Sequence, residues 1–231
     1  MIDKMKIHDL VEHEFLRDEV CVITIKEHGP TRNQKGLIEA FCGLLNALYK
    51  GPVKLVIFQG YLKQIHITSN SGEVSVDESC VIEQTKAGML QDIISRAPFF
   101  TLSRMAGQID DLYADIAISC DWRLVSEVSQ LCFAARRNLN EVRTSTRLAE
   151  LIGSFRAFDN ILRRRAISAK EAVEIGLSLS VAQEENIVAV LEKHALAVKK
   201  ESIAVMRRAI RDPIPNDISV ARIVSSVSVA S

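Results

Sequence analysis

The order of apolar and polar positions in the first quarter of the chain predicts a strand, a helix and a second strand. Val20–Ile25 (VCVITI) is a β-branched apolar run of strand length, and a glycine–proline pair follows it closely. Residues 37–48 then carry apolar side chains at helical spacing, and a second glycine–proline pair stops this helix before the apolar run of residues 53–58. This succession predicts a β-α-β unit with a right-handed crossover and parallel strands.

The central part of the chain predicts a long surface loop followed by further alternating elements. Residues 60–87 are polar and irregular, so we expect a surface loop there, and function often resides in such loops. Gly107 is expected to turn the chain after a strand. The other predicted elements are a helix over residues 89–95, a strand over 97–102 that Pro98 helps to start, a buried helix over 112–119, a strand over 122–125 and an amphipathic helix over 143–151.

The last part of the chain predicts a short capped helix and a helical arm. Ser168 and Glu171 have the spacing of a capping box, which predicts that a helix begins there. Gly176 is placed to end this short helix. Residues 184–211 carry apolar side chains in helical rhythm on two sides, so we expect a core over residues 1–183 and a C-terminal helical arm and tail over residues 184–231. Because the two-sided pattern would leave an exposed apolar patch on a monomer, a homotrimer or hexamer is expected.

Composition narrows the function classes. The chain has 231 residues, 48% of them hydrophobic and 25% charged, which is typical of one α/β domain. Its 29 basic and 29 acidic residues cancel, so no net field favours nucleic acid or an anionic membrane. The five cysteines are scattered through apolar runs, which indicates reduced thiols rather than disulfides or a zinc site. Since no signal peptide or membrane-spanning run is seen, a cytoplasmic protein is expected.

Two strings in the second half carry a family resemblance, and weaker matches extend it over nearly the whole chain. The first is the apolar helix that ends in Cys120 and Asp121 and is followed by RLVSE at 123–127; the second is ISAKEA at 167–172, which leads into Gly176. They are similar to the CD-x-R-x-A-S-E and I-S-A-x-E-A-x-x-x-G-L stretches of the crotonase (enoyl-CoA hydratase/isomerase) superfamily. The likeness is nearest to short members that serve polyketide and other specialised metabolism.

The resemblance implies an α/β fold: a crotonase-like ββα spiral of two nearly perpendicular sheets, with a C-terminal helical arm for oligomerisation. It also implies binding of acyl thioesters of coenzyme A or of a carrier protein. Two backbone amides would hold the thioester oxygen while an enolate forms, because fixed donors stabilise developing charge without reorganising.

The site residues that the resemblance implies depart from the family pattern. Alignment on Gly107 and Cys120 places Asp-Leu-Tyr, at 111–113, where crotonases carry a glycine triplet at a helix start. The Leu112 amide would be one oxyanion donor, and Asp115 occupies the position of a catalytic glutamate, so Asp115 and then Asp111 are the acid/base candidates. Both acids also suit a first helical turn for stability alone. An ionised Asp111 about 4 Å from the oxyanion would cost on the order of 4 kcal/mol at an effective dielectric of about 20.

The remaining positions of the family's active site match this sequence less well. The second glutamate of hydratases aligns near Ala135, so water addition by two carboxylates is not expected. The other oxyanion amide aligns with the loop after Gly60, where Ile67, Thr68 and Gly72 are candidate donors. His66 in the same loop is a candidate base, although a lone histidine is more often a loop or core residue with satisfied hydrogen bonds.

Basic residues near the first strand are candidates for substrate binding. Lys26, Arg32 and Lys35 follow that strand, where the resemblance places contacts to the nucleotide end of coenzyme A. A solvated surface cluster is the alternative. No tightly bound cofactor is expected, since coenzyme A or phosphopantetheine would arrive as part of the substrate. The sequence holds no P-loop, Rossmann fingerprint or metal-ligand cluster.

Two functions therefore stay open from the sequence, and a third, a fold-only interaction protein without thioester binding, is less favoured. One is an enzyme that isomerises, dehydrates or decarboxylates an acyl thioester with an atypical active site. The other is a catalytically depleted homologue, a pseudoenzyme, that assists a carrier protein or synthase as an accessory subunit. The altered glycine triplet and the alanine at the second glutamate position favour the second somewhat.

Overall fold

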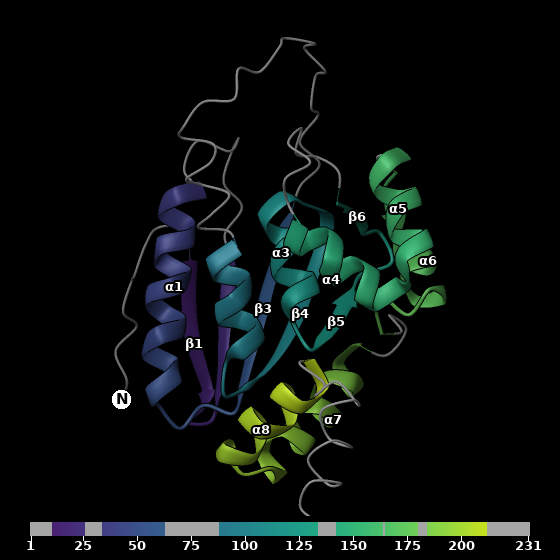
Figure 1. The fold of residues 1–231 in the computed structure, drawn as a ribbon. Coiled ribbons are helices and arrows are strands. Elements are labelled where there is room, and N and C mark those ends of the chain that lie inside the picture. The colour runs from purple at the N-terminus through teal and green to yellow at the C-terminus, as the bar shows by residue number, and fades with distance from the viewer. Residues whose placement is uncertain are drawn as a thin grey trace, which may run out of the picture.

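The computed structural model describes residues 11–25, 34–62, 88–133, 142–163, 165–179 and 184–211. Strands and helices alternate through most of the chain, and helices follow one another at its end (Figure 1). The strands are β1 (Val11–Arg17), β2 (Val20–Ile25), β3 (Leu55–Leu62), β4 (Phe100–Asp110), β5 (Trp122–Val125), β6 (Gln130–Cys132) and β7 (Ile167–Ser168). The helices are α1 (Gln34–Lys50), a helix over residues 88–96, α3 (Asp111–Ser119), α4 (Val142–Ile152), α5 (Ser154–Arg163), α6 (Ala169–Glu174), α7 (Glu184–Ala197) and α8 (Lys200–Arg211).

The described strands form a seven-stranded sheet in the order β1-β2-β3-β4-β6-β7, with β5 paired to β4. β1 and β2 form an antiparallel hairpin, while β2, β3, β4, β5 and β6 run parallel. The predicted β-α-β unit is thereby confirmed, because β2 pairs in parallel with β3 and α1 connects them. The carboxyl ends of β2, β3 and β4 consequently meet at one edge, which we call the carboxyl edge of the sheet.

Both faces of the sheet are covered by helices. Alternate residues of β2 such as Ile23 pack with α1, α3, α4 and the helix over residues 88–96. The intervening residues, such as Val22, pack on the opposite face with α7 side chains that include Leu191. Strands buried on both faces need a continuous apolar run rather than strict alternation, and this explains the uninterrupted VCVITI of β2.

The predicted turn at Gly107 is wrong, since β4 continues through this residue to Asp110. On one side β4 pairs with β3 as far as Gly107; on the other it pairs with β5 as far as Met105 and with β6 from Gln108 onward. Gly107 has φ of 87°, a conformation that costs glycine little. The glycine thus lets one strand change partners without ending, and β4 delivers the chain directly to α3.

Other boundaries also differ from the predictions. The strand expected from residue 97 begins at Phe100, because the preceding helix extends to residue 96. Residues 60–62, expected to open a loop, are the last residues of β3. The capped helix is as predicted: the Ser168 hydroxyl accepts a hydrogen bond from the Glu171 amide, and Gly176 has φ of 75°.

The predicted C-terminal arm consists of two helices, α7 and α8, which lie together at one end of the molecule (Figure 1). Lys54 donates to the Leu196 carbonyl at 3.2 Å and Lys200 donates to the carbonyls of Tyr49 and Gly51. The arm is therefore fastened to the core of its own chain. Its role in oligomerisation and the perpendicular arrangement of two sheets stay predictions.

Burial fits the expected state of the cysteines that the structure describes. Cys21 and Cys120 are buried free thiols, and burial raises the pKa of each to about 12, with Glu14 and Asp121 adding to the effect respectively. Among the described helices, none has the length and apolar character needed to cross a membrane.

Candidate functional site

The structure brings some of the predicted site residues to the carboxyl edge and says nothing of others. Asp111 is the first residue of α3, Leu112 the second, and Asp115 lies one turn later. Lys35 lies in the first turn of α1. Residues that fall outside the described part of the chain are Lys26, Arg32, His66, Ile67, Thr68, Gly72 and Ala135. Their proposed roles stay predictions.

The start of α3 has the local geometry that oxyanion binding needs. The first amide groups of any helix have no acceptor within the helix, and this holds for the Leu112 amide in the first turn of α3. The Leu112 side chain is buried in the core, and Tyr113 packs against that core. Leucine therefore serves at this position as a core residue, which gives a structural reason for the departure from glycine.

Gly60 marks the neighbouring strand at the same edge. A β-carbon at this position would lie 3.0 Å from the Ile25 carbonyl oxygen, closer than side chains normally approach. A larger residue would therefore push apart β2 and β3 near their carboxyl ends, and glycine avoids this contact. In open α/β sheets, ligands bind beyond the carboxyl ends of the strands, so this edge is the expected place for a site.

Asp115 is the buried carboxylate of α3, with 3% of its surface exposed. Its Oδ1 accepts a hydrogen bond of 2.7 Å from the Thr144 hydroxyl, which lies in the first turn of α4. The same hydroxyl accepts a hydrogen bond of 3.0 Å from Nε2 of Gln91, on the helix over residues 88–96. Three side chains from three helices thus form one hydrogen-bonded chain that ends at the carboxylate, and Asp115 and Thr144 each have further interactions.

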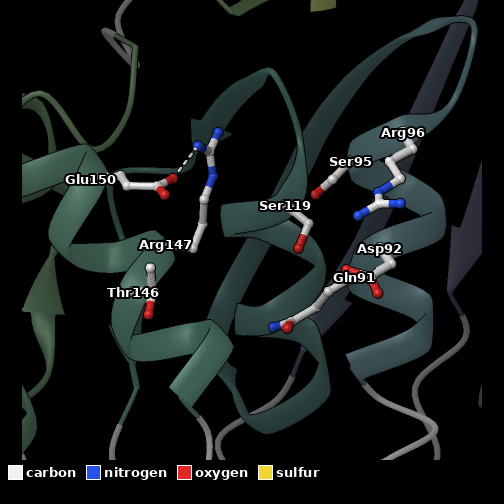
Figure 2. Close-up of a pocket in the computed structure, with 8 residues that line it drawn as sticks. All are labelled: Gln91, Asp92, Ser95, Arg96, Ser119, Thr146, Arg147 and Glu150. Atoms are coloured by element: carbon white, nitrogen blue, oxygen red, sulfur yellow. Dashed lines mark hydrogen bonds and ion pairs between the residues drawn. The ribbon is translucent and has the colours of Figure 1, made fainter. Parts of the chain in front are cut away.

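A polar pocket of about 360 Å³ lies beside this chain of side chains, between the helix over residues 88–96 and α4. Figure 2 shows that Gln91 and Arg96 approach it from one helix, Thr146 and Arg147 from α4, and Ser119 from the end of α3. Asp92, Ser95 and Glu150 complete the lining. Its size is at the lower end for ligand pockets. Gln91 belongs to both the pocket wall and the Asp115 chain.

Arginines cap the other end of α3. Arg147 donates to the Ile118 carbonyl at 3.2 Å, Arg211 to the Ser119 carbonyl at 2.8 Å and Arg123 to the Cys120 carbonyl at 2.7 Å. Cations stabilise the negative end of a helix, where the last carbonyls lack intrahelical donors. Burial, with smaller contributions from the charges of Arg147 and Arg211, lowers the pKa of Arg123 to about 10, while Cys120 and Asp121 oppose this change. These arginines stabilise the C-terminal end of α3, which is the end away from the carboxyl edge.

Asp121, which follows α3, joins that end to the C-terminal arm. It forms ion pairs with Arg207 at 2.9 Å and Arg211 at 2.8 Å, and accepts hydrogen bonds from the amide and hydroxyl of Thr101. Arg207 is 3% exposed and also donates to the carbonyls of Ile94 and Ala97. Burial lowers the pKa of Arg207, while Asp121 opposes that effect. The Cys-Asp pair of the sequence motif is therefore part of the scaffold.

No group of three or more histidine, cysteine, aspartate or glutamate side chains within the described ranges is arranged to hold a metal ion. Neither a family sequence model nor a curated protein sequence matches the chain. An enoyl-CoA hydratase from Bacillus anthracis superposes with a TM-score of 0.73 at 16% identity, covering 95% of this chain and 90% of that one.

The chain has the enoyl-CoA hydratase fold. The enoyl-CoA hydratase of Mycobacterium smegmatis gives a TM-score of 0.74 at 15% identity, covering 96% of this chain and 90% of that one. An enoyl-CoA hydratase from Shewanella pealeana gives 0.71 at 11% identity, with 97% and 89% covered. Solved members of the enoyl-CoA hydratase/isomerase group thus share this α/β architecture over nearly their full length. At these identities, the likeness shows the fold alone.

Sequence reasoning missed two residues of the candidate site. Thr144 and Gln91 belong to segments that the sequence identified as helices, but nothing in their spacing relates them to Asp115. Their meeting depends on how α3, α4 and the helix over residues 88–96 pack together. A buried hydroxyl at the start of an amphipathic helix is a weak signal, since threonine there is also common for capping.

Proposed function

We propose that this chain binds acyl thioesters of coenzyme A or of a carrier protein at the carboxyl edge of its sheet, and that Asp115 moves a proton at the carbon next to the thioester carbonyl. The Leu112 amide would hold the carbonyl oxygen as the enolate forms, and Ile67 or Thr68 would supply the second donor. The reaction class is isomerisation-like proton transfer, in which a single carboxylate accepts a proton and returns it. The proposal includes a cytoplasmic homotrimer or hexamer.

The observation that carries this proposal is the placement of Asp115. A buried carboxylate is costly unless hydrogen bonds satisfy it, and here a hydroxyl from another helix does so one turn from the first amides of α3. This combination of an available backbone donor and a held carboxylate, on a hydratase fold, is what enolate chemistry needs. Lys26, Arg32 and Lys35 are proposed for the nucleotide end of coenzyme A. The link to polyketide or other specialised metabolism rests on the sequence resemblance alone.

A panel of coenzyme A thioesters tests the binding part of the proposal. Acetyl-, butyryl- and crotonyl-CoA are each added to the protein, and thermal unfolding is followed. A ligand at a hundred times its dissociation constant should stabilise the fold by about 2.7 kcal/mol, which raises the melting temperature of a chain of this size by about 5–10 °C. Adenosine diphosphate at the same concentration controls for nucleotide binding. Absence of a shift with every thioester would contradict the proposal.

The rate of crotonyl-CoA hydration tests the expectation that the site has one catalytic carboxylate rather than two. Because Ala135 aligns where hydratases carry their second glutamate, we expect a rate at least about 100-fold below that of an ordinary hydratase. Loss of absorbance of the conjugated thioester reports the rate. Turnover within tenfold of an ordinary hydratase would mean that another group supplies the missing carboxylate.

An accessory role is a second candidate, and one surface favours it. The helix α5 exposes an apolar stripe in which Phe155 is 85% exposed, Phe158 66% and Leu162 71%. Contiguous exposed apolar side chains on a soluble protein often mark an interaction surface. A catalytically depleted subunit would bind its partner through such a surface and keep that binding when Asp115 is replaced. The proposed enzyme would lose its activity in the same variant.

A further inference from the structure

The donor and acceptor in each hydrogen bond around Asp115 follow from the chemistry of its neighbours. Gln91 donates its Nε2–H to the Thr144 oxygen at 3.0 Å. A hydroxyl has one proton, so Thr144, which accepts from the amide, directs that proton to Oδ1 of Asp115 at 2.7 Å. The chain of donors therefore runs from Gln91 through Thr144 to the carboxylate. Oδ1 of Asp115 at its end is a hydrogen-bond acceptor, and a hydrogen bond donated to a carboxylate favours its ionised form.

We propose that Thr144, supported by Gln91, is a positioning residue that holds the Asp115 carboxylate ionised and oriented as a base. This inference rests on the proposed function and deepens it, because it assigns Asp115 the task of accepting a proton from the substrate rather than donating one. Asp115 would take the proton from the acyl α-carbon, the C–H electron pair would pass into the enolate, and the same carboxyl would return the proton.

Burial makes this arrangement effective. Thr144 is 5% exposed and Gln91 9%, so water competes little for the bonds that they make. Hydrogen bonds to an ionised group in such a place are stronger than those between neutral groups. Threonine has a short, branched side chain with one stiff rotatable bond, so a hydroxyl held by a neighbouring amide has little freedom to leave the carboxylate. Thr144 thus fixes one oxygen of Asp115.

The support from Gln91 comes from a different helix, and Figure 2 shows its side chain reaching from the helix over residues 88–96 in the direction of α4. Its removal would take away one of the hydrogen bonds that hold the Thr144 hydroxyl and leave the bond to Asp115 in place. We therefore expect Gln91→Leu to affect the reaction less than Thr144→Val. A larger loss of rate in Thr144→Val than in Gln91→Leu would indicate that the hydrogen bonds act on Asp115 in sequence. Equal losses would indicate that the three side chains only contribute packing.

The test compares Thr144→Val, which keeps the shape and removes the hydroxyl, with Thr144→Ser, which keeps the hydroxyl. For Thr144→Val we expect kcat for deuterium exchange at the α-carbon of butyryl-CoA to fall about 10- to 100-fold with KM within twofold, since misplacement of a reacting group by about 1 Å has this effect. Thr144→Ser should stay within threefold of the unaltered protein. Thr146→Val, an exposed threonine on the same helix that lines the pocket, is the matched control.

A second readout does not depend on turnover. The carboxyl carbon of Asp115 is followed by NMR as pH changes, and loss of the hydroxyl donor in Thr144→Val should move its titration midpoint to higher pH, with return in Thr144→Ser. If no thioester is processed by the unaltered protein, the proposed function fails, and this titration alone decides whether Thr144 holds the carboxylate. A Thr144→Val protein with unchanged midpoint, or with unchanged kcat in an active enzyme, would overturn the inference.

Discussion

Replacement of Asp121 by asparagine should destabilise the protein by about 3–5 kcal/mol, because it removes the charge that compensates two arginines of α8. Arg207 is almost fully buried, and an asparagine amide would place N–H groups where guanidinium and hydroxyl donors already point. The free energy of unfolding, from urea denaturation followed by circular dichroism, measures the effect. We expect α8 to lose its hold on the core, since Arg207 joins it to the residues around Asp121.

Asp159→Asn is the matched control for this prediction. Asp159 pairs with Arg163 at 2.5 Å, but the arginine side chain of that pair is 73% exposed. Solvent screens such pairs, and their contribution is about 0.2–1 kcal/mol. A similar, small loss of stability in both variants would show that the pair at Asp121 is screened by water and that α8 is held by other contacts.

Asp115→Asn should lower the rate of proton exchange at the acyl α-carbon by about 10²–10⁴-fold and leave thioester affinity nearly unchanged. Asparagine retains an oxygen that can accept from Thr144, so the hydrogen-bonded chain can persist while the base is lost. Deuterium uptake from heavy water into butyryl-CoA, followed by mass spectrometry, gives the rate, and thermal shift gives the affinity.

Asp18→Asn provides the comparison for this variant, because Asp18 lies in the turn between β1 and β2, at the edge of the sheet opposite the proposed site. It should exchange deuterium at the unaltered rate. Exchange that persists in Asp115→Asn within tenfold would identify another base, and Asp111 would be the next residue to replace. Partner binding retained in an Asp115→Asn protein whose parent shows no exchange would instead support the accessory role.

Much of the fold could be predicted from the sequence because its signals are local. The apolar run of β2, the capping box at Ser168 and the helical spacing of α1 each determine an element without reference to distant residues. The errors occur where distant partners decide. Gly107 resembles a turn residue, yet its positive φ serves a strand that changes neighbours. β1 was missed because its mixed polar and apolar residues suit an edge strand whose outer side has no partner strand in the described sheet.

The candidate site could be predicted only in part for a similar reason. Asp111, Leu112 and Asp115 share one helix, so alignment along the sequence was sufficient to relate them. Their surroundings come from other elements. The Leu112 side chain, which replaces a glycine of the family pattern, is packed into the core by residues from other elements. The hydrogen-bond partners of Asp115 come from two other helices, which belong to separate parts of the chain. Sequence spacing does not predict that these helices contact α3.

The structure of a complex with a slowly reacting acyl-CoA tests the central claim most directly. The account predicts that the thioester lies at the carboxyl edge of the sheet, with its carbonyl oxygen about 3 Å from the Leu112 amide nitrogen and its α-carbon about 3–3.5 Å from an Asp115 carboxylate oxygen. Thr144 should remain hydrogen-bonded to the other oxygen of Asp115. A thioester bound elsewhere, or one whose carbonyl points away from α3, would contradict the account.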